Sequence, residues 1–318
     1  MATYIVRRLL QAIVVLLIVT MIIFLATRLL PGDPILMYIT SDSLEEATQE
    51  QIDALRKEFG LDKPMAEQYV VWIAGVVRGD LGRSITYRDS VSEEVARRLP
   101  ITFHLGSIAF LISIIVGIPL GVVSAIRRGT WLDSTATTLA NAGITVPIFW
   151  LGILMIYVFS LELGWLPVFG YTSPFKDFVL STRQAIMPII CLAIFPISGA
   201  ARQARSSMLE VVRQDYIRTA WSKGLSERVV IGKHALKNSV IPVVTMIGIQ
   251  VGHILGGSVF IETVFAIPGI GRLLVNSIFL HDYVVVQAIL LIVTVTVLLV
   301  NLIVDLSYAW LDPRIRYR

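Results

Sequence analysis

Few residues of this chain are spaced for covalent or nucleotide chemistry. Gly232-Lys233-His234 contains the Gly-Lys pair of a phosphate-binding loop, but Glu227 stands where that loop needs its first glycine. His234 also replaces the hydroxyl residue that such a loop places after its lysine. The sequence contains neither a His-Glu-x-x-His zinc pair nor a Gly-x-Ser-x-Gly nucleophile turn. We therefore expect no Walker-type ATP site in this chain and no enzymatic activity of its own.

The metal-binding and redox residue types are equally sparse. The four histidines fall on different predicted elements, so their spacing predicts no metal site: His104, His234, His253 and His281. Cys191 is the only cysteine, which excludes a disulfide framework. We expect this chain to bind no metal and no cofactor.

The composition shows what kind of elements must carry the function. Charged residues are 16% of the 318 residues, whereas a soluble domain carries about 25%. Apolar residues are 55% and the mean hydropathy is +0.76. The net charge of +4 suggests nucleic acid, but in a membrane protein the placement of charge matters more than its sum. The sequence predicts an all-α polytopic membrane protein in contact with lipid, and no nucleic-acid partner.

Six stretches are long and apolar enough to span a bilayer, which needs about 20 such residues. They are 9–30, 101–126, 135–163, 185–201, 240–261 and 284–309. The first is too long for the apolar part of a signal peptide and lacks a cleavage site, so we expect it to be retained. Pro100 is expected in the first turn of the second span, and Asp133 or Ser134 at the N-cap of the third.

Lysine and arginine in the short loops predict the orientation. The cations of the termini, of the loop after span two and of the segment between spans four and five all fall on one face, which the positive-inside rule makes cytoplasmic. These include Arg7, Arg8, Arg127, Arg128, Arg202, Arg205, Arg213, Arg218, Lys223, Arg228, Lys233, Lys237, Arg314, Arg316 and Arg318. The opposite short loops hold only Lys176, Arg183 and Arg272. Both termini are therefore expected in the cytoplasm.

The segment 31–99 is expected to form an extracytoplasmic subdomain. Helices are predicted over 45–60, with Gly60 as the C-cap glycine, and over 64–77. The second helix carries an apolar stripe of Met65, Tyr69, Trp72, Ile73 and Val76, which could bind a partner; we favour packing within the subdomain and against the membrane surface. The segment holds thirteen acidic against eight basic residues.

The segment 202–237 faces the predicted cytoplasm and should be a set of short helices. One continues from span four, a second covers 215–223 and ends before Gly224, and a third begins after Ser226 and runs through His234. Such a surface could receive a soluble partner or anionic lipid head groups. Charge alone leaves both interpretations open.

Span five carries the features that could line a pathway. His253 is the only ionisable residue deep in a predicted span, and it is expected to make a helix–helix hydrogen bond or to bind a ligand. Small residues repeat along the same span at Gly248, Gly252 and Gly256, with Gly257 next to the last, and also at Gly117 and Gly121 of span two. Such rows permit close helix packing, and in span five also a seam where helices slide. The scarcity of buried carboxylates argues against a proton-coupled transporter.

Ordered motifs now match a known family. The stretch Asp215-Tyr216-Ile217-Arg218-Thr219-Ala220-Trp221-Ser222-Lys223-Gly224 resembles the signature loop of ABC-importer membrane subunits, with Arg218-Thr219-Ala220 in place of the general Glu-Ala-Ala. Further segments agree in order: Leu30-Pro31-Gly32-Asp33-Pro34, Leu163-Gly164-Trp165-Leu166-Pro167, Asn238-Ser239-Val240-Ile241-Pro242, Glu262-Thr263-Val264-Phe265, Pro268-Gly269-Ile270-Gly271-Arg272-Leu273, His281-Asp282-Tyr283 and Leu311-Asp312-Pro313-Arg314. Trp221 departs from a commoner arginine.

The chain thus resembles the dipeptide/oligopeptide/nickel permease group, and its long first outer loop resembles the first permease of the pair. The resemblance implies an ABC type I importer fold in the bacterial cytoplasmic (inner) membrane. It also implies a second homologous permease, two ABC ATPase subunits that bind ATP and Mg²⁺, and an extracytoplasmic solute-binding protein. Short peptides are the expected cargo, with nickel complexes or glutathione as alternatives.

The resemblance also assigns roles within the chain. It implies that Asp215, Tyr216, Arg218, Thr219, Ala220, Lys223 and Gly224 couple the chain to an ATPase subunit. The expected organisation is 1–30 as tail and first span, 31–99 as the outer subdomain, and 100–318 as a five-helix core with the coupling loop 202–237. An ion-coupled secondary transporter and a structural or receptor-like membrane protein are the competing classes.

Overall fold

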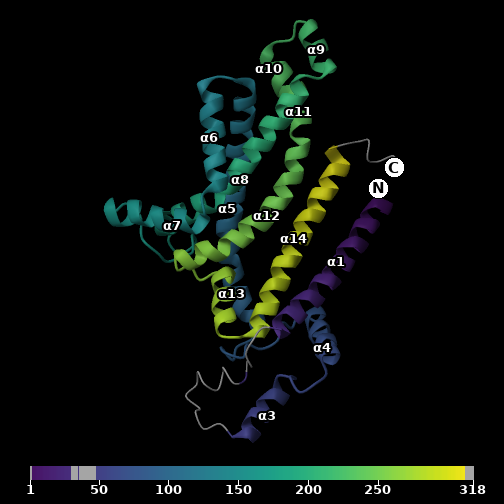
Figure 1. Ribbon diagram of the computed structural model, residues 1–318, viewed down its shortest axis with the longest axis vertical. Helices are drawn as coiled ribbons and strands as arrows, with labels where there is room; N and C mark the ends of the chain where they lie inside the picture. The colour runs from purple at the N-terminus through teal and green to yellow at the C-terminus, as the bar shows by residue number, and fades with distance from the viewer. Residues whose placement is uncertain (1, 30–34, 36–47, 312–318) are drawn as a thin grey trace. The chain divides into compact units, whose positions relative to one another are not determined.

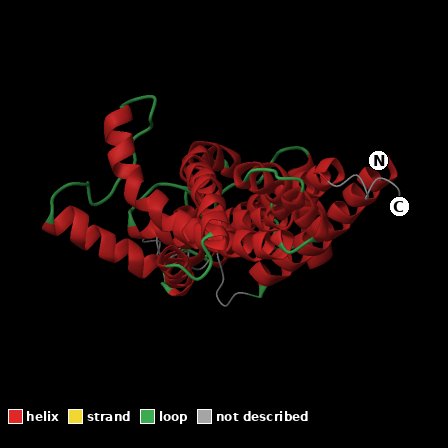
Figure 2. Cartoon of the chain, turned by 90° about the horizontal axis from the view of Figure 1, so that it is seen from above, coloured by secondary structure: helices red, strands yellow, loops and turns green. Residues whose placement is uncertain are grey.

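The computed structural model describes residues 2–29, 35 and 48–311. Throughout these residues the fold is helical, and the sole β-type pairing in them is an isolated bridge between Arg83 and Ser90 (Figure 2). The predicted all-α class is therefore confirmed. The motifs at 30–34 and 312–314, and the predicted start of the first outer helix at 45–47, lie outside the described residues.

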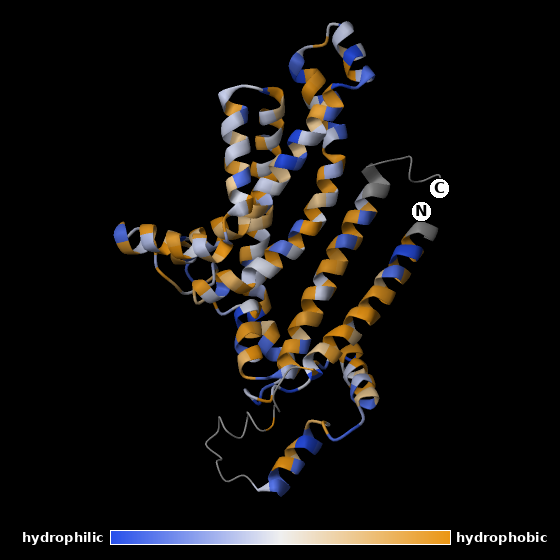
Figure 3. Cartoon of the chain, in the orientation of Figure 1, coloured by the Kyte–Doolittle hydropathy of each residue, from blue (hydrophilic) through white to orange (hydrophobic). Residues whose placement is uncertain are grey.

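Five helices of the described chain are long and apolar enough to cross a membrane. They are α1 (Ala2–Arg28), α5 (Val91–Ile126), α8 (Phe178–Val212), α12 (Ile241–Val264) and α14 (Tyr283–Leu311). A bent pair brings the number to six if its two halves are one span: α6 (Trp131–Thr145) followed by α7 (Ile148–Met155) and the π-helix η1 (Ile156–Glu162). Colouring by hydropathy shows α1 and α14 as largely apolar helices (Figure 3).

The expectation of one continuous third span over 135–163 is wrong. The two halves meet at an angle of 103° at the break after Thr145. Val146 is extended there, at φ −73° and ψ 124°, because the ring of Pro147 disfavours a helical residue before it. The N-cap of α6 is Thr130, so the predicted caps Asp133 and Ser134 lie inside the first turn.

Two other spans are longer than their apolar stretches. The helix α5 begins at Val91, so Pro100 lies inside it and not in its first turn. The added turns are polar, and Glu94 accepts from Arg97 at 2.8 Å and from Arg98 at 2.9 Å, which stabilises a helix outside the apolar stretch. The helix α8 likewise extends to Val212, with Pro188 and Pro196 in its interior.

The chain folds as two compact units. The first comprises residues 1–6, 103–267 and 299–318. In it α8 packs along α6 and α12, and α7 packs on both α8 and α12 (Figure 1). Span two joins this packing at Gly117, where an added Cβ would lie 2.8 Å from the Cβ of Ala200. The predicted close packing at this glycine pair is confirmed.

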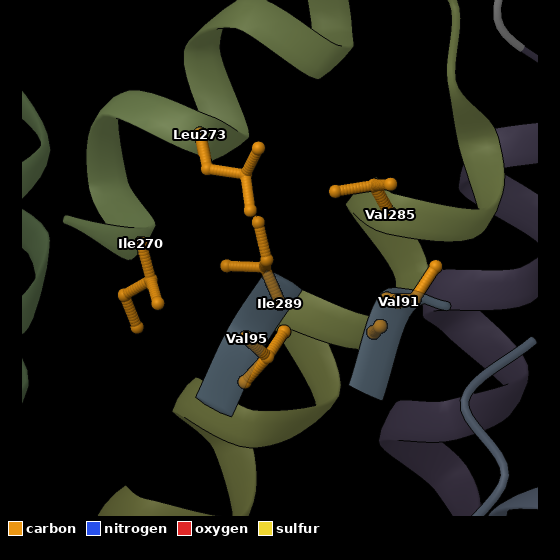
Figure 4. Close-up of a cluster of buried hydrophobic side chains, with 7 residues drawn as sticks. Val91, Val95, Ile270, Leu273, Val285 and Ile289 are labelled. Atoms are coloured by element: carbon orange, nitrogen blue, oxygen red, sulfur yellow. The ribbon is translucent and has the colours of Figure 1, made fainter. Parts of the chain in front are cut away.

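The second unit comprises residues 7–102 and 268–298. Its core joins the start of α5, the start of α14 and α13 (Ile270–Phe279), as Figure 4 shows for Val91, Val95, Ile270, Leu273, Val285 and Ile289. All six side chains are at least 95% buried. This core holds the starts of α5 and α14 together with α13 in one cluster.

Two helices of the predicted subdomain 31–99 belong to the second unit. The first, α3 (Gln49–Glu58), begins with a capping box between Thr48 and Gln51. It is followed by Gly60 at φ +63°, which confirms the predicted cap glycine.

The second of these helices is α4 (Met65–Val77), which packs on span one. Tyr69 meets Thr20 at 3.0 Å and the ring of Phe24 at 5.5 Å, while Trp72 stacks on Phe24 at 6.2 Å. These contacts support packing as the role of this part of the stripe. Met65, in contrast, is 57% exposed.

Candidate functional site

The segment after α8 forms a cap of short helices, all within the first unit. The helix α9 (Asp215–Ser222) ends at Lys223, and Gly224 follows in the left-handed region at φ +73°. The predicted helix and its terminating glycine are therefore confirmed. Ser226 begins the next helix, as predicted. That helix runs past His234, as α10 (Glu227–Val229), π-helix η2 (Val230–Ala235) and α11 (Leu236–Ser239).

The inner face of α9 fixes this cap to the end of span four. Ile217 is fully buried and Ala220 is 6% exposed, and both join a cluster with Ala125, Met208, Val230 and Ala235. Their spacing of three places both side chains on one face of a helix. Within the cap, α11 is joined to α9, because the amide nitrogen of Asn238 donates to the hydroxyl of Tyr216 at 3.0 Å. The cap is therefore packed on α8 and is not a loose basic loop.

The outer face of α9 is uncovered and polar. Arg218 and Asp215 have 75% and 97% of their side chains exposed and face each other at 3.6 Å. Tyr216 and Trp221 are each more than two-fifths exposed, and Thr219, Lys223 and Gly224 are exposed too. Six of the seven residues assigned to coupling thus lie at the surface. Ala220 is the exception, because its methyl group supports the helix from within.

The glycines of α12 face different neighbours. A Cβ at Gly248 would lie 3.0 Å from Val304 of α14, and a Cβ at Gly257 would lie 3.1 Å from Ile148 of α7. Both glycines therefore permit close helix packing inside the chain. Gly256 has nothing within 4 Å of the same position. The row consequently does not form one seam: its two ends serve packing and Gly256 faces open space.

His253 lies next to Gly256 at a groove. The cavity there measures about 340 Å³ and lies between α7, α8 and α12, with Gly252, His253, Gly256, Gly257, Phe195 and Phe260 among its lining residues. The His253 ring centroid is 4.8 Å from that of Phe195. The expected helix–helix hydrogen bond is absent among the described residues, since His253 is exposed and contacts this ring instead. Ile249 and Phe260, on the same helix face, are exposed as well.

Sequence reasoning missed an ion pair that ties three spans together near the cap. The Asp133 carboxylate accepts from Arg205 Nε at 2.8 Å and Nη2 at 3.0 Å, from Ser124 Oγ at 2.6 Å and from the Gly129 amide at 3.0 Å. It therefore joins α6 to α8 and to the end of α5. The signal in the sequence was a carboxylate at the start of an apolar helix, which by itself predicts an N-cap. The ion pair could not be inferred because Arg205 lies 72 residues away in the chain.

The motif His281-Asp282-Tyr283 has a structural role in the second unit. The buried Asp282 accepts from the hydroxyl of Ser84 and from the amide of Thr86 at 3.1 Å. It thereby ties the strand-like loop before α5 to the start of α14. No three His, Cys, Asp or Glu side chains among the described residues lie close enough to hold a metal ion.

Comparison with known proteins agrees with this architecture. Residues 117–317 match the family described as binding-protein-dependent transport system inner membrane component, and residues 1–106 match its N-terminal region. The chain belongs to this family of transport permeases.

Full-length relatives carry transport names. A glutathione transport system permease protein of Escherichia coli is 41% identical, and the alignment covers all of both chains. A dipeptide transport system permease protein of Alkalihalophilus pseudofirmus is 39% identical, also over the whole of both. A Brucella abortus protein named for a peptide transport system permease is 45% identical over both full lengths.

A solved structure shows the same fold in the core. A chain of the MetNI methionine ABC transporter, in an inward-facing conformation, aligns with a TM-score of 0.57 at 19% identity. The alignment covers 69% of this chain and 96% of the other. The five-to-six-span arrangement is therefore the ABC type I importer permease fold.

Proposed function

We propose that this chain is one permease subunit of an ATP-driven importer that carries short peptides delivered by an extracytoplasmic solute-binding protein. Three full-length relatives, named for peptide, dipeptide and glutathione transport, support this substrate class. Glutathione is itself a short peptide. Nickel complexes are the remaining alternative within the same machinery.

One observation carries the proposed coupling. The helix α9 is anchored by buried Ile217 and Ala220, yet it leaves a polar and aromatic face uncovered. A helix held on one side and bare on the other can transmit a push to the span that it is packed on. ATP and Mg²⁺ belong to two partner ATPase subunits in this proposal, and α9 contacts one of them.

The proposed topology and pathway follow from the same arrangement. The face with α9 and both termini is cytoplasmic, the membrane is the bacterial cytoplasmic (inner) membrane, and a second homologous permease completes the pathway. In this proposal the groove at His253 and Gly256 forms part of the wall; the supporting observation is that the His253 imidazole is exposed there and has no hydrogen-bond partner among the described residues. Gly252 lies on the same wall, and Gly248 and Gly257 position the wall by close packing.

The test begins with gentle purification of the tagged chain in mild detergent and identification of what accompanies it. We expect two ATPase subunits and a second permease. ATP-independent uptake driven by a proton gradient in liposomes would instead establish an ion-coupled transporter. Competition with dipeptides, glutathione and nickel chelates then distinguishes the cargo.

Crosslinking tests the contact made by α9. With Cys191 replaced by serine, cysteines at Arg218 and Thr219 should form disulfides with cysteines introduced on the ATPase surface, while cysteines at Ile217 and Ala220 should not. Equal crosslinking from both faces, or from neither, contradicts the assignment.

A further inference from the structure

A second and larger cavity lies near the cap, between α5, α6 and α8. Its volume is about 440 Å³, within the range of small-molecule sites. It lies wholly within the first unit and is separate from the groove at His253. No role for it follows from the coupling helix or from the pathway.

The two sides of this cavity differ in chemistry. The walls from α5 and α6 are mostly apolar or small, with Leu120, Gly121, Ala136 and Ala140. The wall from α8 and its C-cap carries Arg202, Arg205 and Arg213, while Arg128 comes from the turn after α5. Glu210 is the one carboxylate among the lining residues. The cavity is therefore amphipathic, with a strong excess of positive charge.

The four arginines are not equivalent. Arg205 is already neutralised by its two hydrogen bonds to Asp133. Arg128, Arg202 and Arg213 form no ion pair among the described residues, and all three are exposed. Like charges around one cavity repel unless solvent or an anion lies between them. The Asp133 ion pair fixes the α6 and α8 walls and so holds the cavity open without neutralising it.

These features define the occupant by its chemistry. Guanidinium groups bind phosphate oxygens with two parallel hydrogen bonds, and basic pockets between membrane helices bind anionic lipid head groups. An adjoining apolar wall suits the glycerol and first methylenes of an acyl chain. We infer that this cavity binds a phosphate group through Arg128, Arg202 and Arg213, and that the phosphate belongs to an anionic phospholipid. Which leaflet supplies the lipid rests on the proposed orientation, whereas the binding itself does not.

The experiment measures binding to the complete purified transporter. Native mass spectrometry follows the uptake of phosphatidylglycerol, phosphatidylcholine and inorganic phosphate by the wild type and by Arg128→Gln/Arg202→Gln. The matched control is Arg127→Gln/Lys237→Gln, which removes the same charge from exposed residues that do not line the cavity. We expect phosphatidylglycerol to bind at least tenfold more weakly to the first variant and within twofold of wild type to the control. Phosphatidylcholine, whose choline cation offsets the charge of its phosphate, should bind weakly and equally in all three.

Further arms separate the possible outcomes. Arg128→Lys/Arg202→Lys keeps the charge and should restore part of the affinity, which shows that the glutamine variant fails through charge and not through misfolding. If inorganic phosphate binds with the same arginine dependence and phosphatidylglycerol does not, the phosphate site stands but its lipid source is refuted. If the glutamine variant binds both anions normally, the inference is overturned. If the glutamine variant also releases the ATPase subunits while it binds both anions normally, the inference is likewise overturned, because the arginines then contact protein and not phosphate.

Discussion

The turn after α9 offers the sharpest test of coupling, because backbone conformation alone explains the glycine there. Gly224 has φ +73°, a conformation that costs an L-residue about 1–2 kcal/mol. Apart from Gly224 and its two chain neighbours, no described residue has an atom within 4 Å of the place where a Cβ at this position would stand. A side chain would therefore meet no steric obstacle in this chain, and the penalty is conformational.

The penalty translates into a population. A loss of about 1.4 kcal/mol is a tenfold change in an equilibrium constant, so Gly224→Val should shift the α9–α10 turn away from its observed geometry by roughly that factor. Asparagine adopts the left-handed conformation far more readily than a β-branched residue. We therefore expect coupling to fall in the order glycine, asparagine, alanine, valine.

The assay is the amount of peptide imported per ATP hydrolysed by the complete transporter in liposomes with its binding protein. Gly224→Val should lower this ratio severalfold, and Gly224→Asn should stay near wild type. Normal coupling in Gly224→Val would refute the role of the turn. A loss in Gly224→Asn as large as in Gly224→Val would show that bulk against a partner matters, and the conformational reasoning would be wrong.

Three further predictions concern other parts of the chain. Asp133→Asn should lower the free energy of unfolding by about 2 kcal/mol, which is less than for a fully buried ion pair because the Arg205 side chain is 30% exposed. The control Asp215→Asn, at an exposed ion pair, should lower it by less than about 0.5 kcal/mol. Thermal unfolding followed by tryptophan fluorescence measures both variants, and equal midpoints would contradict a stabilising role for the Asp133–Arg205 ion pair. In a Cys191→Ser background, cysteines on the exposed face of α12 should react with a water-soluble thiol reagent, at rates that change when nucleotide is trapped: Ile249, His253, Gly256 and Phe260. Cysteines on its buried face should not react: Gln250, Ile254, Ser258 and Ile261. If no position reacts in any nucleotide state, α12 does not line the pathway. Replacing α3 by a Gly-Ser linker of equal length keeps the packing of Tyr69 on Phe24. This change should lower the uptake of peptide delivered by the binding protein more than it lowers the basal rate of ATP hydrolysis. Unchanged uptake would exclude a role for α3 in receiving the binding protein.

Hydropathy and local signals were sufficient for much of this protein. A run of apolar residues predicts a span because backbone groups in lipid must be satisfied within the helix. The sequence predicted that Gly60 and Gly224 end helices, because few other residues adopt a backbone conformation with positive φ at low cost. Charge around the short helix 215–223 predicted a surface, and α9 occupies nearly that range. The motifs in chain order indicated the family.

Other features depended on residues distant in the chain. Pro147 breaks the third span, while Pro188 and Pro196 leave α8 helical; local sequence alone does not separate these cases. A contact from outside the helix lies at the second of these prolines: the side-chain amide of Gln250 in α12 donates to the carbonyl of Pro196 at 3.0 Å. Contacts of this kind come from a neighbouring helix, and only tertiary structure supplies them.

The same reason explains the sites. Spacing put Gly248, Gly252 and Gly256 in one row, but the neighbours decide that Gly248 packs on α14 and that Gly256 remains open. The motif placed Ala220 among residues expected at the coupling surface, whereas in the structure its side chain is buried in the cluster with Ile217 and Met208. The cavity lined by Arg128, Arg202 and Arg213 joins residues of α5, α6 and α8 and the turns that follow α5 and α8. The sequence showed these arginines only as separate positive charges along the chain. Which face of a helix is covered is set by long-range packing, and local residue order therefore determined the elements while tertiary contacts determined their surfaces.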